Sequence, residues 1–72
     1  MSQREGTLIY DRKAERYDVR FGLDEYYGGL HCGTSLEVLI HGNWKPTRIE
    51  YGDDWYLVGT GGIWIDGLRV RL

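Results

Sequence analysis

Cysteine is nearly absent from this chain, which limits both disulfides and metal sites. Cys32 is the only cysteine among 72 residues, so no disulfide can form within the chain. A tetrahedral zinc site needs several ligands at constrained spacing, and Cys32, His31 and His41 form neither a C-x-x-C nor an H-x-x-x-H motif. We therefore expect no metal site and no cofactor, and a single free thiol is typical of a reducing cytoplasm.

The chain also lacks long apolar runs and an excess of positive charge. No stretch approaches the roughly 20 apolar residues of a membrane-spanning helix, so we expect no membrane association. Residues 1–6 carry no apolar segment of the signal-peptide type, and we expect a flexible tail there and a cytoplasmic protein. The formal net charge of −2 argues against a dedicated nucleic-acid binder, since such proteins show a basic excess.

Aromatic side chains, in contrast, are plentiful. The sequence contains three Trp, six Tyr and one Phe. A domain of this length buries only about 60% of the surface of its unfolded chain, and large rings bury much area per residue. We expect one domain over residues 1–72 with a core built partly from these rings.

Apolar residues recur at every second position, which is the spacing of half-buried strands. Tyr17, Val19 and Phe21 alternate with charged residues in this way. Further strands are expected over residues 7–10, 35–40, 47–51 and 55–58, with a last hairpin of 63–65 and 68–72 joined at Asp66-Gly67. These strands predict an all-β fold, a small single-domain SH3-like barrel of about five to seven short antiparallel strands, because closure removes exposed sheet edges.

The alternation also predicts which side chains face inward. The expected outer face carries alternating charges, and if the last strand pairs beside the strand of Arg48 and Glu50, Glu50 lies across from Arg69 or Arg71. The expected core consists of Leu8, Tyr17, Val19, Leu36, Val38, Ile40, Ile49, Trp55, Leu57, Leu68 and Val70.

Several motifs resemble one known family. They are H-C-G-T-S-L-E-V-L at 31–39, W-K-P-T-R-I-E-Y at 44–51, D-W-Y-L-V-G at 54–59 and G-L-R-V-R-L at 67–72. In this order they resemble a family of small uncharacterised proteins from Gram-positive bacteria and their mobile elements, known only as a domain of unknown function. The resemblance implies a compact β domain in a plasmid, phage or integrative-element setting. It implies no activity, cofactor or catalytic residue.

No catalytic constellation can be assembled from the residues. His31 and Cys32 are neighbours and would point to opposite faces of a strand, so an inert, buried cysteine is expected. The adjacent carboxylates Asp53 and Asp54 are typical of a solvated turn. The glycine run 59–62 leads into a strand instead of the helix that follows known phosphate-binding loops. We expect no catalytic residue and no enzyme.

The aromatic surplus is the best indication of function. More rings are present than a small barrel interior can hide, and exposed Trp and Tyr are enriched at protein interfaces. The sequence therefore predicts a non-enzymatic binding module that engages another protein in a mobile-element context. The predicted binding residues are Tyr26, Tyr27, Trp44, Tyr56 and Trp64, together with Arg48 and Glu50.

Three alternatives stay open at this point. The surplus rings are equally consistent with caps on the open ends of a barrel. A nucleic-acid-binding barrel is favoured by two basic clusters, residues 12–20 and the set Arg48, Arg69 and Arg71. A self-associating structural module, for example a homodimer, would bury the surplus rings at its seam.

Overall fold

Six antiparallel strands and no helix make up the computed structural model, which describes residues 3–72. The strands are β1 (Glu5–Asp11), β2 (Arg16–Arg20), β3 (Ser35–Ile40), β4 (Asn43–Tyr51), β5 (Trp55–Leu57) and β6 (Arg69–Arg71). They form one sheet in the order β2-β1-β6-β3-β4-β5. The predicted all-β fold of short antiparallel strands is confirmed. Within residues 3–72, no helix is long and apolar enough to cross a membrane.

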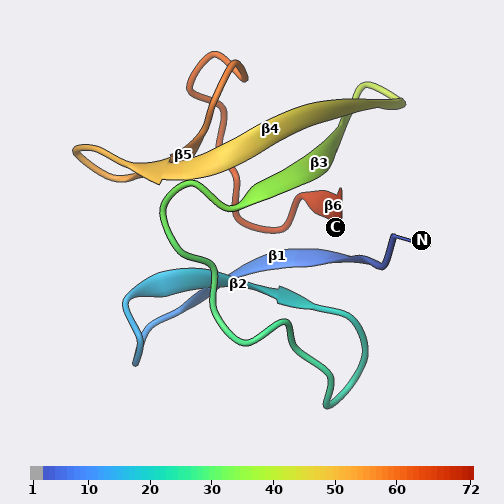
Figure 1. Ribbon diagram of the computed structural model, residues 1–72, viewed down its shortest axis with the longest axis vertical. Coiled ribbons are helices and arrows are strands. Elements are labelled where there is room, and N and C mark those ends of the chain that lie inside the picture. The colour runs from blue at the N-terminus through green and yellow to red at the C-terminus, as the bar shows by residue number, and fades with distance from the viewer. Residues whose placement is uncertain (1–2) are drawn as a thin grey trace.

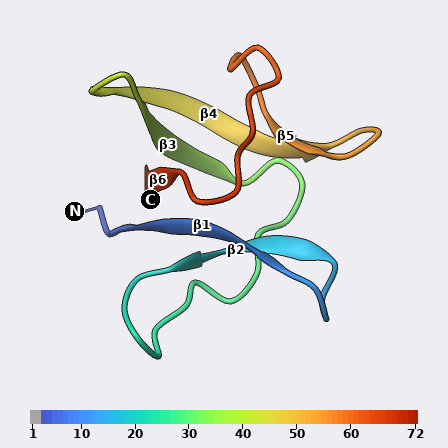
Figure 2. The ribbon, with the colours of Figure 1, turned by 180° about the vertical axis from the view of Figure 1, so that it is seen from behind.

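The sheet folds over on itself without closing. Strands β3, β4 and β5 lie across one side of the molecule, β1 and β2 lie across the other, and β6 joins the two halves (Figures 1 and 2). The edge strands β2 and β5 do not pair with each other, so the sheet is not a closed ladder. The edge of β2 is covered by the following loop, where Tyr27 and Leu30 donate backbone N–H bonds of 2.8 Å to Val19 and Tyr17. Covering the edge satisfies carbonyl groups that would otherwise face water.

The turn between β4 and β5 forms as predicted, but the C-terminal hairpin does not. Residues 63–65 are not a strand, and β6 instead lies between β1 and β3, with Val70 opposite Val38. The cause is a set of backbone hydrogen bonds to β1, because Leu8 accepts from Gly67 at 2.7 Å and donates to Leu68 at 2.8 Å. The Asp66-Gly67 turn therefore leads the chain onto β1 and does not fold it back on residues 63–65.

The core fills the space between the two halves of the sheet. The predicted core residues Ile40, Trp55 and Leu68 are partly buried and pack against it. Leu30 and Ile65 are also buried but lie in loops, and neither belongs to the predicted core. The predicted residues that are buried are Leu8, Tyr17, Val19, Leu36, Val38, Ile49, Leu57 and Val70.

The ordered sheet starts earlier than the sequence predicted. Glu5 and Gly6, expected in a flexible tail, belong to β1, and Arg4 exchanges two backbone hydrogen bonds of 3.0 Å with Leu72. The rest of the expected tail includes Met1 and Ser2, which lie outside the described residues. Gly6 is sterically required, because a Cβ atom there would lie 2.6 Å from the carbonyl oxygen of Arg20.

Candidate functional site

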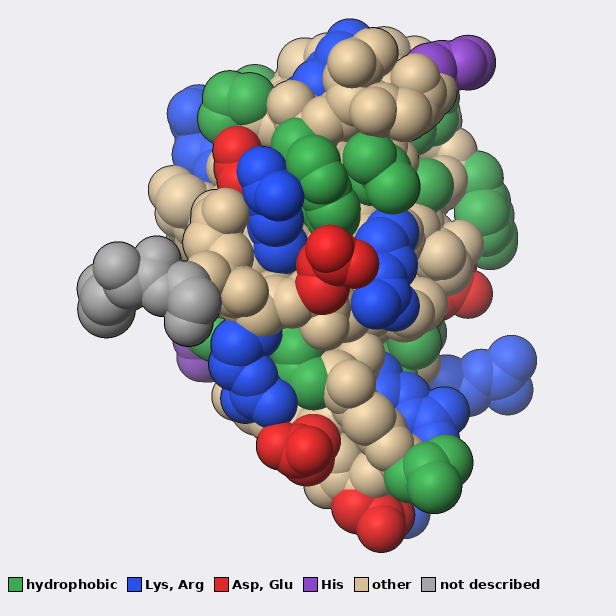
Figure 3. Space-filling model, turned by 90° about the vertical axis from the view of Figure 1, so that its right-hand side faces the viewer, with side chains coloured by type: hydrophobic (Ala, Val, Ile, Leu, Met, Phe, Trp, Pro, Cys, Tyr) green, Lys and Arg blue, Asp and Glu red, His purple; other side chains and the backbone are tan. Residues whose placement is uncertain are grey.

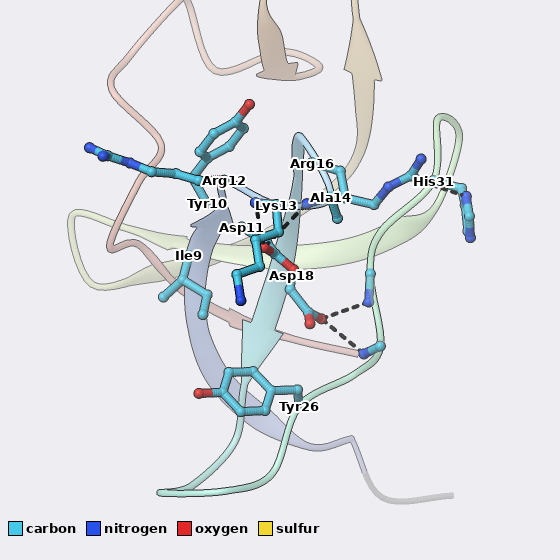
Figure 4. Close-up of a pocket in the computed structure, with 12 residues that line it drawn as sticks. Ile9, Tyr10, Asp11, Arg12, Lys13, Ala14, Arg16, Asp18, Tyr26 and His31 are labelled. Carbon is cyan, nitrogen blue, oxygen red and sulfur yellow. Dashed lines mark hydrogen bonds between the residues drawn. The ribbon is translucent and has the colours of Figure 1, made fainter.

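A surface groove of about 780 Å³ lies between the β1–β2 turn and the long loop that follows β2. Tyr10 at the end of β1 and Tyr26 in the loop both line this groove, and each keeps nearly half of its surface exposed. In Figure 4 the two rings lie at opposite ends of the groove, and Lys13 reaches from the turn toward its middle. We call this feature the Tyr10–Tyr26 groove.

Asp18 holds one wall of the groove in place. Its side chain is 8% exposed, and its Oδ1 atom accepts backbone N–H bonds from Val19 at 2.8 Å and from Gly28 and Gly29 at 2.9 Å. Both glycines have positive φ angles of 112° and 99°, which residues with a side chain rarely adopt. One buried carboxylate therefore fixes the path of the loop across β2 (Figure 4).

The opposite wall is a tight turn that presents cations. Asp11 Oδ1 accepts the backbone N–H groups of Lys13 at 3.0 Å and Ala14 at 3.3 Å, an arrangement typical of Asp at the start of a turn. Arg12 and Lys13 are exposed at this turn. Arg16, at the start of β2, instead reaches the loop and donates to His31 Nδ1 at 2.8 Å. Hydrogen bonds within the chain thus hold both walls of the groove.

Most of the other arginines are neutralised by carboxylates. The second basic cluster expected from the sequence is paired throughout, and on the side of the molecule where the chain ends lie, acidic side chains alternate with basic ones (Figure 3). Hydrogen bonds from the side chains of Arg71 and Gln3 to the Glu37 carboxylate lower the pKa of Glu37. The ion pairs are Arg4–Glu25 at 2.9 Å, Arg48–Glu50 at 2.8 Å, Arg69–Glu5 at 3.0 Å and Arg71–Glu37 at 2.7 Å.

The cations at the groove differ from these. Among residues 3–72, Arg12, Lys13 and Arg16 make no ion pair. Two carboxylates, Asp11 and Asp18, also line the groove, and their oxygens accept backbone N–H groups. Because the three cations outnumber these two carboxylates, the lining of the groove is positive, although the whole chain is slightly acidic.

Four of the predicted binding residues share the outer face of β4 and β5. Trp44, Arg48 and Glu50 occupy alternate positions of β4 and so point to one face, and Tyr56 lies opposite Glu50. Arg48 is bound to Glu50, and the Arg71 guanidinium lies 4.2 Å from the centre of the Trp44 ring. Arg48 and Glu50 therefore neutralise each other on this face, and Tyr56 is the aromatic ring exposed there.

The remaining three predicted residues lie on two distant loops. Tyr26 lines the groove, and Tyr27 follows it with half of its surface exposed. Trp64 is 81% exposed in the loop between β5 and β6, which lies at the opposite end of the molecule from the loop that follows β2 (Figures 1 and 2). The predicted residues therefore belong to three surfaces and do not form one patch.

Sequence reasoning missed Tyr10 as a site residue. Its ring packs edge-on against Tyr17, with centroids 5.2 Å apart and planes at 64°. Burial raises the pKa of Tyr17, and the nearby carboxylates Asp66 and Asp54 raise it further. The signal that pointed to this region was the run of cations at residues 12–20, which follows Tyr10 directly.

The structure also revises the expectation for Cys32. Its side chain is exposed, where a buried one was predicted. Residues 31–34 form a turn, closed by a 3.0 Å bond from the Thr34 N–H to the His31 carbonyl, so the alternation of a strand does not apply. Over the described part of the chain, no group of three or more His, Cys, Asp or Glu side chains is arranged to hold a metal ion.

Fold and surface together define a small all-β domain with a cation-bearing groove. Residues 6–72 match the family described as Domain of unknown function (DUF5348), and the chain belongs to that family. It is also similar to a protein from Ruminococcus gnavus whose crystal structure is known. The two are 58% identical with a TM-score of 0.90, and the match covers 96% of this chain and 100% of that one. Among proteins with curated descriptions, no relative is found.

Proposed function

We propose that this protein is a non-enzymatic binding module that holds a segment of another protein in the Tyr10–Tyr26 groove. One observation carries the proposal: two half-exposed tyrosines share a groove with three cations that make no ion pair within residues 3–72. Exposed Tyr next to Arg is the composition of interface hot spots. Free positive charge beside them favours a partner segment that carries carboxylates.

The rigidity of the groove supports this function. Binding a segment costs less when the receptor is already ordered. Asp18 and Arg16 hold the loop through three short hydrogen bonds, to Gly28, Gly29 and His31. The loop also covers the edge of β2, so a partner would bind by its side chains and not by adding a strand to that edge.

Selection from a display library of short random peptides tests the proposal. We expect enriched peptides to combine Asp or Glu with an apolar side chain. Lys13→Glu should weaken their binding by at least about tenfold. The control is Lys45→Glu, which makes the same charge change at another exposed lysine without an ion pair in the described chain. No enrichment, or equal loss with both variants, would contradict the proposal.

Nucleic acid is the second candidate, and the same free cations favour it. Arginine and lysine beside exposed rings can bind the phosphates and bases of a single strand. Such binding weakens steeply with added salt. Fluorescence anisotropy with labelled oligouridine and oligothymidine at low salt distinguishes this candidate from the first, and no change in anisotropy would remove it.

Three finer expectations also belong to this proposal. An SH3-like barrel is supported by the covered β2 edge and by the 3.3 Å bond from Trp55 Nε1 to the Glu15 carbonyl, which links β5 to the β1–β2 turn. A mobile-element setting in Gram-positive bacteria rests on the resemblance given above, and a cytoplasmic location rests on the single free thiol. Self-association is supported by the exposed ring of Trp64, and sedimentation showing a monomer at high concentration would count against it.

A further inference from the structure

Tyr10 also lines a second cavity of about 380 Å³, which we call the Tyr10–Trp55 cavity. Its other lining residues are Glu15, Cys32, Tyr51, Asp54 and Trp55. These come from the β1–β2 turn, the loop before β3, and the β4–β5 hairpin. The cavity therefore lies where the two halves of the folded sheet meet, across the gap between β2 and β5.

Aromatic rings form the walls of this cavity. Tyr51 and Trp55 pack edge-on, with ring centroids 5.0 Å apart and planes at 65°. Trp55 Nε1 donates to the Glu15 carbonyl at 3.3 Å, which fixes the indole against the turn. Tyr51 is 57% exposed. The electron-rich faces of such rings attract cations, and a flat guanidinium can also stack on them.

The charged side chains lining the cavity are both acidic. Glu15 and Asp54 make no ion pair within residues 3–72. Asp54 uses Oδ1 to accept the Trp55 N–H at 2.8 Å, and this bond orients its carboxylate on the hairpin. The lining of the cavity therefore carries negative charge.

We propose that the Tyr10–Trp55 cavity binds an arginine side chain of a partner protein. The rings supply stacking surfaces, and Glu15 and Asp54 supply charge of the complementary sign. The same carboxylates would repel a phosphate backbone. This inference goes beyond the proposed function and does not require it, because the acidic cavity and the basic groove share only Tyr10. A partner segment that crosses Tyr10 would meet cations on one side and carboxylates on the other.

NMR titration with Nα-acetyl-arginine amide tests the proposal on the whole chain. We expect saturable shifts of the Trp55 indole signal and of the backbone amides of Tyr51 and Cys32. Nα-acetyl-citrulline amide has nearly the same shape without the charge, and it should give no saturable shift. Equal shifts with both compounds, or shifts centred on Trp64, would overturn the proposal.

A matched pair of variants in one turn makes the test specific. Asp54→Asn keeps the oxygen that accepts the Trp55 N–H but removes the charge, and should raise the dissociation constant about two- to fivefold. Asp53→Asn removes an exposed charge from the neighbouring residue, which does not line the cavity. This variant should leave the dissociation constant unchanged. Equal effects of the two variants would mean that the probe responds only to the overall acidity of the turn.

The failure of this inference is distinguishable from failure of the proposed function. Lys13→Glu should weaken binding of the acidic peptides at least about tenfold and leave the arginine-amide titration unweakened, because Lys13 does not line the cavity. If the acidic peptides bind as expected but the arginine amide does not, only the cavity assignment is wrong. If the arginine amide binds and no peptide is selected, the cavity assignment stands without the groove.

Discussion

Asp18→Ala removes the carboxylate that ties β2 to the loop beside the Tyr10–Tyr26 groove. Three backbone N–H groups, those of Val19, Gly28 and Gly29, donate to the same oxygen at 2.8–2.9 Å. The bonds to Gly28 and Gly29 are partly buried and the bond to Val19 is buried. The variant leaves all three donors without this acceptor, and water can replace it only in part.

The magnitude follows from the number and burial of these bonds. A hydrogen bond to a charged group contributes about 1.5–3 kcal/mol, and partial rehydration of the loop recovers some of the loss. We therefore expect Asp18→Ala to lower the free energy of unfolding by about 2–4 kcal/mol. For a domain of this length the total is about 4–10 kcal/mol, so Tm should fall by about 10–25 °C.

Urea unfolding followed by circular dichroism measures the loss, and Asp18→Asn provides the comparison. Asn keeps an oxygen acceptor but not the charge, so we expect it to cost about 0.5–1.5 kcal/mol. Hydrogen exchange of the Gly28 and Gly29 amides should also become faster in Asp18→Ala. A loss below about 0.5 kcal/mol in the alanine variant, or equal losses in the two variants, would refute this account of the loop.

Three further predictions concern the sheet and the surface. Gly6→Ala should lower the free energy of unfolding by about 1–3 kcal/mol in the same assay, because its Cβ would lie 2.6 Å from the Arg20 carbonyl oxygen and 2.6 Å from Val19 Cγ1. The raised pKa of Tyr17 means that the folded state holds this proton more tightly than the unfolded chain. Its contribution to stability is therefore complete below about pH 10 and is lost as pH rises through the folded-state pKa, and Tyr17→Phe should show a smaller alkaline decline. Trp64→Ser should change stability by less than about 0.5 kcal/mol, because the ring is 81% exposed.

The strands could be predicted because their alternation reflects burial of one face. Leu36 and Val38 are buried while Glu37 between them is not, and this pattern specifies both the strand and its inward side. The position of β6 could not be predicted in this way. The three residues of β6 alternate as in any strand. The neighbours of β6 are set by backbone hydrogen bonds between residues 67–68 and Leu8, and Leu8 is far from β6 in the sequence. Period-two patterns specify strands but not their neighbours.

The groove was less accessible to sequence reasoning than the sheet. Asp18 alternates with Tyr17 and Val19 and so reads as a solvated outer residue, yet the loop 21–34 covers it and uses it as an acceptor. Burial of Leu30 has the same cause, since a loop that crosses β2 carries no periodic signal. The sequence shows Arg12 and Lys13 in the turn, but only the structure shows that they make no ion pair within residues 3–72 while most other arginines do.

Chemical-shift mapping of a display-selected acidic peptide tests the central claim most directly. The account places the peptide in the Tyr10–Tyr26 groove, so the largest amide shifts should fall in residues 9–14 and 26–31. Residues 41–48, at the far end of β4, should shift least. Largest shifts on the outer face of β4 and β5, or around Trp64, would contradict the assignment of the groove as the binding surface.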